Sequence, residues 1–196
     1  MSFAQVLQIP VARPIFTREI SNRMYGTTSY YMASIVVSLF TFGLYPLISS
    51  LASFPFFGFK ESSFSDLMHW VFIMYLVGMA GSYWGFMIGS FAKNEVSAVQ
   101  INLVCLYLFS FGGGFYANTG ANENYFVEAL TYISPVRFSS ELLMRRVLAG
   151  REETDIILEQ LGFTWGEERC ILCLIIFLVV CFFIGWASFL FKMRNF

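Results

Sequence analysis

Four long runs without a charged residue constrain the fold of this chain more than any other feature. Each run is between 22 and 36 residues long, and they occupy residues 24–59, 67–92, 96–122 and 170–191. The hydrocarbon core of a bilayer is about 30 Å thick, and about 20 apolar residues of α-helix cross it. Each run is therefore long enough to cross a membrane once.

The backbone inside a bilayer must satisfy its own hydrogen bonds, which leaves helices or a closed barrel as the possible structures. Barrel strands are only about 10 residues long, so the runs predict helices. The composition agrees, since 57% of the residues are hydrophobic and 13% are charged. We therefore predict an all-α membrane protein with about four transmembrane helices, at residues 30–51, 67–91, 97–116 and 170–191.

The segments outside the spans have their own expected structure. Pro10 and Pro14 mark the start of an amphipathic helix that we expect to lie along the membrane interface. A long external loop, residues 118–168, is expected to contain short amphipathic helices. Three consecutive glycines, residues 112–114, should break the end of the third span.

The charges of the polar segments predict the orientation of the chain. Four spans put both termini on one side, together with the link at residues 93–95, and these segments carry a net positive charge. The positive-inside rule then places the termini in the cytoplasm of a multi-pass membrane protein. The net charge of the whole chain is −1, which argues against a nucleic-acid partner.

The motifs of common catalytic sites do not occur in this sequence. There is no phosphate-binding loop of the GxxxxGK[ST] type, and His69 is the single histidine, so no metal-ligand motif is available. We predict no catalytic residue, no metal site and no bound cofactor for this chain. The spans hold no clear ionisable residue, which argues against an ion pump and favours a lipophilic or amphipathic substrate.

Small residues recur every fourth position in the second span, at Gly81, Gly85 and Gly89. This doubled GxxxG pattern lets another helix backbone approach closely within a membrane. The pattern does not name the partner helix. We favour packing within the subunit over dimerisation.

A second stripe follows one face of the third span and is more polar and smaller than its surroundings. It consists of Gln100, Leu103, Tyr107 and Ser110, spaced by three and four residues. A stripe of this kind faces protein or a cavity and not lipid. A substrate path and a seam between packed helices are both consistent with it.

Three stretches of the chain, in order, resemble one family over nearly its whole length. They are Phe16-Thr17-Arg18-Glu19 with Tyr25 and Tyr30-Tyr31-Met32-Ala33; Leu76 to Asn94 with residues 111–115; and Tyr132 to Phe138 with Glu141-Leu142-Leu143, followed by Leu161-Gly162. This order is similar to the membrane domain of the G subfamily of ABC transporters, the white-type and pleiotropic drug-resistance exporters. The third stretch, which resembles Y-I-S-P-x-R-Y-x-x-E-A-L-L, is the most specific.

The resemblance implies roles for particular residues. Arg18 and Glu19 match the segment that couples the membrane domain to the ATPase domain. The matching span of the family lines a central cavity, which favours the substrate-path interpretation of the stripe at residues 100–110. Bulky residues after the matching glycine close that cavity, so Phe115 and Tyr116 are the expected gate.

The resemblance also implies partners. We expect a nucleotide-binding domain that carries ATP and Mg²⁺, the remaining spans of the transporter, and a second membrane domain in a homodimer or heterodimer. The chain would then be the membrane-spanning permease part of an exporter. Ile20, Arg23 and Ser34 depart from the family pattern RERxxGxY…YYxAK, and the ATPase domain and first two spans are not in this sequence. The alternative is therefore a non-transporting structural subunit derived from such a permease.

Overall fold

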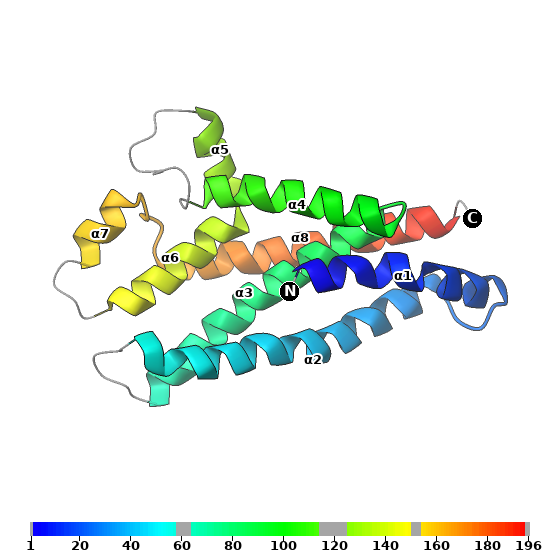
Figure 1. The fold of residues 1–196 in the computed structure, drawn as a ribbon, viewed down its shortest axis with the longest axis horizontal. Coiled ribbons are helices and arrows are strands. Elements are labelled where there is room, and N and C mark those ends of the chain that lie inside the picture. The colour runs from blue at the N-terminus through cyan, green and yellow to red at the C-terminus, as the bar shows by residue number, and fades with distance from the viewer. Residues whose placement is uncertain (1, 58–63, 114–124, 150–153, 195–196) are drawn as a thin grey trace. The chain divides into compact units, whose positions relative to one another are not determined.

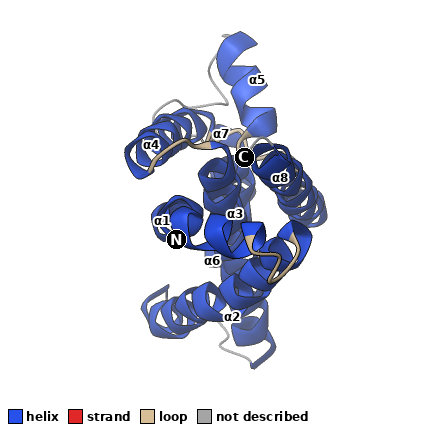
Figure 2. Cartoon of the chain, turned by 90° about the vertical axis from the view of Figure 1, so that its right-hand side faces the viewer, coloured by secondary structure: helices blue, strands red, loops and turns tan. Residues whose placement is uncertain are grey.

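The computed structural model describes residues 2–57, 64–113, 125–149 and 154–194 (Figure 1). All regular secondary structure within these ranges is helical (Figure 2). In chain order the helices are α1 Ser2–Ser21, α2 Thr27–Ser53, the 3-10 helix η1 Phe54–Phe57, α3 Phe64–Phe91, α4 Glu95–Gly112, α5 Tyr125–Ile133, α6 Pro135–Leu148, α7 Thr154–Gln160 and α8 Glu167–Arg194.

Four segments of the described chain are long and apolar enough to cross a membrane. They are α2 together with η1, α3, α4, and α8 as far as Met193. The predicted all-α membrane fold with about four transmembrane helices is therefore confirmed. Three short helices, α5, α6 and α7, lie in the segment that was expected to be a long loop with helices of its own.

The third span ends earlier than the expected range 97–116. Helix α4 stops at Gly112, Gly113 forms a turn, and residues 114–116 lie outside the described residues. A side chain on Gly112 would meet the backbone oxygen of Leu130 at 2.8 Å, and one on Gly113 would meet Val136 at 2.6 Å. The glycines thus allow α5 and α6 to approach the end of α4.

Helix α1 begins at Ser2, so the prediction that Pro10 and Pro14 mark its start was wrong. Both prolines lie inside the helix. Several residues of its first turns are buried, and side-chain oxygens there have partners: the Ser2 hydroxyl donates to Asn102 Oδ1 at 2.7 Å, and Ser38 on α2 donates to Gln8 Oε1 at 3.0 Å. Internal partners make it possible to bury this polar segment.

The second and third glycines of the doubled GxxxG pattern contact α1 of the same chain. A Cβ on Gly85 would collide with the backbone of Ser2, and one on Gly89 would lie 2.7 Å from the carbonyl oxygen of Val6. Nothing lies within 4 Å of a Cβ built on Gly81. The structure therefore places Gly85 and Gly89 in the α1–α3 contact and leaves Gly81 outside it.

The chain divides into two compact units, each with parts of several helices. The first comprises Met1–Tyr45, Gly78–Leu103 and Leu178–Phe196. Its core is a cluster of buried side chains from α1, α2, α3 and α8: Ile9, Phe16, Tyr31, Ile35, Phe86 and Phe189. Tyr31 also donates its hydroxyl hydrogen to the Phe182 carbonyl oxygen at 3.0 Å, which ties α2 to α8.

The second unit comprises Pro46–Val77 and Val104–Phe177. It contains α5, α6 and α7 and the ends of spans that adjoin them. Side-chain contacts connect its elements: Asp66 on α3 forms an ion pair with Arg146 on α6, and His69 on α3 contacts the Glu167 carboxylate on α8. All four side chains are partly exposed.

Two helices end with the same capping motif but with different residues at its left-handed position. After α7, Phe163 N–H donates to Leu158 O at 2.8 Å and Gly162, at φ 72°, takes the left-handed conformation. After α1, Met24 N–H donates to Glu19 O at 3.1 Å, and Arg23 holds this position at φ 56°. Glycine is the usual residue there because it has no Cβ.

Candidate functional site

The end of α3 is held by two cationic side chains from other helices. Arg13 on α1 donates to the carbonyl oxygens of Ala92 at 2.8 Å and Lys93 at 2.6 Å. Lys192 on α8 donates to the same Ala92 oxygen and to Phe91 O at 3.2 Å. The last carbonyls of a helix lack internal partners and carry partial negative charge, so cations stabilise this end.

The start of α4 is capped just as specifically. The Asn94 side-chain oxygen accepts a hydrogen bond from the Ser97 N–H at 2.9 Å, which is the usual arrangement of a helix N-cap. The link between the two spans is therefore fixed on its α3 side by Arg13 and Lys192 and on its α4 side by Asn94. We call Arg13, Lys93 and Lys192 the basic junction.

An open groove of about 790 Å³ runs between α1 and this link. Its lining combines cationic and apolar groups: Pro10, Arg13, Pro14, Thr17, Arg18, Ser21, Lys93, Asn94, Glu95 and Val96. Burial lowers the pKa of Arg13, and the two backbone carbonyls hold its guanidinium in place. The groove thus offers a net positive surface at the ends of two candidate spans.

The two expected coupling residues lie on different sides of α1. Arg18 is exposed and lines the groove. The Glu19 carboxylate instead accepts a hydrogen bond from the Tyr25 hydroxyl at 2.5 Å. Burial raises the pKa of Tyr25 to about 12, and the negative charge of Glu19 adds to the effect. Glu19 therefore fixes the turn between α1 and α2.

The stripe on α4 faces away from the described packing of the chain. Leu103 is 38% exposed, Tyr107 is 59% exposed and Gln100 is also exposed. Ser110 is half-buried and donates to the Leu106 carbonyl at 2.9 Å. The opposite face holds Ala98, Asn102 and Phe109, all buried. The role of the stripe as a substrate path or as a packing seam stays a prediction.

The expected gate residues, Phe115 and Tyr116, lie outside the described residues. The same holds for Gly114, which precedes them. Their role stays a prediction.

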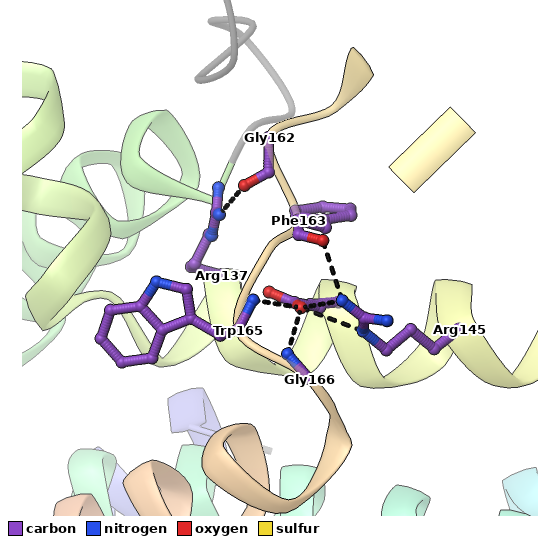
Figure 3. Close-up of polar contacts among 7 residues, drawn as sticks. Arg137, Arg145, Gly162, Phe163, Trp165 and Gly166 are labelled. Atoms are coloured by element: carbon purple, nitrogen blue, oxygen red, sulfur yellow. Dashed lines mark hydrogen bonds and ion pairs between the residues drawn. The ribbon is translucent and has the colours of Figure 1, made fainter. Parts of the chain in front are cut away.

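The motif at residues 132–143 builds a polar clasp that holds the loop before α8. Ser134 caps α6: its hydroxyl accepts from the Arg137 N–H at 3.4 Å and donates to Phe109 O at 2.7 Å. Arg137 donates to the Gly162 carbonyl oxygen, and its guanidinium lies 4.9 Å from the centre of the Phe163 ring (Figure 3). This motif thus connects α4, α6 and the loop.

Glu141 is the centre of the clasp. It is fully buried, and its Oε1 atom accepts hydrogen bonds from Arg145, from the Trp165 N–H at 2.9 Å and from the Gly166 N–H at 3.0 Å. Figure 3 shows Arg145 and these two backbone groups converging from α6 and the loop. Burial lowers the pKa of Arg137, whereas the negative charge of Glu141 opposes this change. Four donor atoms on one carboxylate oxygen make this a charge-assisted network.

A family model described as "ABC-2 type transporter" matches residues 1–146 of the chain. The matched region contains the groove, the α4 stripe and most of α6. The chain belongs to the ABC-2 type transporter family. It is an integral membrane protein, since the match is to the membrane domain of these transporters and four described helices are long and apolar enough to span a membrane.

One relative of this ABC-2 protein is a plant transporter, "ABC transporter G family member 21" of Arabidopsis thaliana. The two sequences are 25% identical over 142 residues, which cover 72% of this chain and 20% of the relative. The chain thus spans about a fifth of the length of that relative. The resemblance to the G subfamily is confirmed at this level.

Sequence reasoning missed several residues of the ABC-2 chain that the structure brings together. Arg13 and Lys192 lie 179 positions apart yet bind one carbonyl oxygen. Asn102 on α4 is fully buried, but the sequence pattern indicated only the more exposed polar stripe on the same helix. Glu141 was recognised as part of a motif, but its position at the centre of the clasp was not predicted. The available signal was the spacing, because Glu141 precedes Arg145 by four residues and such a pair shares one face of a helix.

Proposed function

We propose that this chain is the membrane-spanning permease part of an ATP-driven exporter for a lipophilic or amphipathic substrate. The observation that carries the proposal is the ABC-2 match over residues 1–146. The absence of an ionisable group from the middle of the sequence runs that form the spans supports an apolar or amphipathic substrate. ATP and Mg²⁺ are held by a nucleotide-binding domain on a partner or on another part of the same protein.

The Arg18 side of the groove between α1 and the α3–α4 link is the proposed contact with that ATPase domain. Arg18 lines this groove and its side chain is exposed, so it can contact an acidic surface of the ATPase domain. Glu19 acts indirectly through the turn at Tyr25, which sets the direction in which α2 leaves α1. The exposed stripe on α4 forms one wall of the substrate path when a second membrane domain is present, with Phe115 and Tyr116 as its gate.

Copurification and transport together test this function. The tagged chain, expressed in its native cells, should retain an ATPase subunit and support ATP-dependent efflux of a fluorescent lipophilic dye from vesicles. Arg18→Glu should weaken both the copurification and the efflux, whereas Arg169→Glu, an exposed arginine at the other end of the spans, should not. Retention of an ATPase subunit without any efflux across a panel of dyes would favour the structural-subunit alternative.

The orientation follows from the charge distribution. We propose that the groove and both termini face the cytoplasm. In a background without native cysteines, Glu95→Cys should resist an impermeant thiol reagent added to intact cells, and Glu159→Cys on α7 should react. The opposite labelling pattern would invert the orientation.

A further inference from the structure

The basic junction concentrates more positive than negative charge, since Glu95 is the one carboxylate among the groove-lining residues that the structure describes. Arg13 and Lys192 both donate to the Ala92 carbonyl oxygen, so their cationic groups converge on one atom. The positive charges of Arg13 and Lys93 also act on Lys192. Among the described residues, no ion pair joins any of the three to an acidic side chain. Backbone carbonyls carry only partial charges, so the junction keeps a net positive field.

Exposed apolar side chains lie within three residues of these cations in the sequence. Phe91 precedes the link and is 51% exposed, and Phe191 precedes Lys192 and is 71% exposed. Val96, which lines the groove, is 65% exposed. All of these residues are at the ends of candidate membrane spans. A cationic site flanked by exposed apolar groups at the edge of a bilayer suits a ligand that is itself amphipathic and anionic.

We propose that the basic junction, Arg13, Lys93 and Lys192, binds the phosphate headgroup of an anionic membrane phospholipid, with its acyl chains alongside Phe91 and Phe191. Phosphate oxygens would supply the full negative charge that the backbone carbonyls lack, and the groove leaves Arg13 and Lys93 accessible. This inference goes beyond transport, because it requires only that the chain lie in a bilayer. A bound lipid would hold α1, the α3–α4 link and the end of α8 together.

Spin-labelled lipids test this proposal. The full chain is reconstituted in phosphatidylcholine vesicles, and electron spin resonance gives the association of labelled phosphatidylglycerol relative to labelled phosphatidylcholine. Each cation near a membrane surface changes anionic-lipid binding by about fivefold at low salt. We expect a preference of about fivefold or more for phosphatidylglycerol in the wild type, and about none in the triple variant Arg13→Gln, Lys93→Gln, Lys192→Gln.

Two variants that each remove one charge keep the test valid if the triple variant misfolds. Lys93 is exposed and no hydrogen bond from its side chain is part of the helix cap, so Lys93→Gln should fold normally and still lower the preference. Arg23→Gln removes an exposed charge from the turn after α1, outside the groove, and should leave the preference unchanged.

Four results would overturn the proposal. The first is a wild type without preference for the anionic lipid. The second is an equal loss of preference in Lys93→Gln and Arg23→Gln, which would indicate general surface charge. The third is displacement of the labelled lipid by inorganic phosphate at constant ionic strength, which would indicate a site for a free anion. Loss of ATPase copurification in Lys93→Gln with an unchanged lipid preference would also overturn it, in favour of a protein contact.

Discussion

Arg23 occupies a backbone conformation that disfavours it. Its φ of 56° lies in the left-handed region, where the Cβ of an ordinary residue crowds the following carbonyl. The chain has Arg here, whereas the related G-subfamily segment has Gly. The same helix-ending motif after α7 has Gly162, which adopts φ 72° without this cost.

Replacing Arg23 with Gly should therefore stabilise the protein. Relief of the left-handed strain is worth about 1 kcal/mol, offset in part by the greater freedom of glycine in the unfolded chain. The midpoint of unfolding in mild detergent measures the change. Arg18→Gly, in the exposed part of α1, should instead destabilise by about 1 kcal/mol because glycine disfavours helix. A lower midpoint for Arg23→Gly would show that the Arg side chain makes a compensating interaction.

Replacing Glu141 should change the stability of the protein more than replacing Arg23. Glu141→Ala leaves the N–H groups of Trp165 and Gly166 without their acceptor and Arg145 without its carboxylate. Loss of one partner from a buried, charge-assisted network costs about 3–5 kcal/mol. Hydrogen exchange at these two amides should accelerate strongly. Glu159→Ala on the exposed face of α7 is the matched control and should change stability by less than about 0.5 kcal/mol.

The α1–α3 contact gives a prediction for whole helices, because three glycines in one pattern meet different surroundings. Gly89→Ala would place a methyl group 2.7 Å from Val6 O, and backbone cannot easily move away. We expect it, and Gly85→Ala, to destabilise by about 1–3 kcal/mol through overpacking. Gly81→Ala should be neutral or slightly stabilising, because its site is open and alanine favours helix.

The oligomeric state distinguishes the alternative for the same glycines. If the pattern serves dimerisation, Gly81→Ala should shift the protein toward the monomer in cross-linking or light-scattering measurements. Loss of stability in Gly85→Ala and Gly89→Ala with no change in assembly would support packing within the chain.

The spans were predictable because burial in lipid excludes charge so strongly that charge-free runs alone mark them. The start of α1 was not predictable, since Ser2, Gln5 and Gln8 look like surface residues. Their inward position depends on partners about 30 and 100 positions away, Ser38 and Asn102. Sequence periodicity records which face of a helix is polar, but not whether another segment satisfies those polar groups.

At the scale of the whole molecule, helix α4 has an exposed face that is not purely apolar. Gln100 and Tyr107 are exposed there, and lipid is a poor environment for an amide or a phenol. On the sequence alone, this stripe is consistent with either a packing seam or a substrate path. Exposure of the stripe in a single chain favours a surface completed by a second membrane domain, as in the proposed function.

Tyr107 provides the sharpest test of that path. In a transporter assembled with its ATPase, Tyr107→Ala should change the relative efflux of two lipophilic dyes by about tenfold, since loss of one aromatic contact in an apolar pocket is worth about 1–3 kcal/mol of discrimination. Leu108→Ala alters the next residue, which is also exposed but lies about 100° around the helix. It should leave the dye preference unchanged at equal expression. Equal effects of the two variants would mean that the stripe does not line the path, because a wall of the path must distinguish adjacent faces of the same helix.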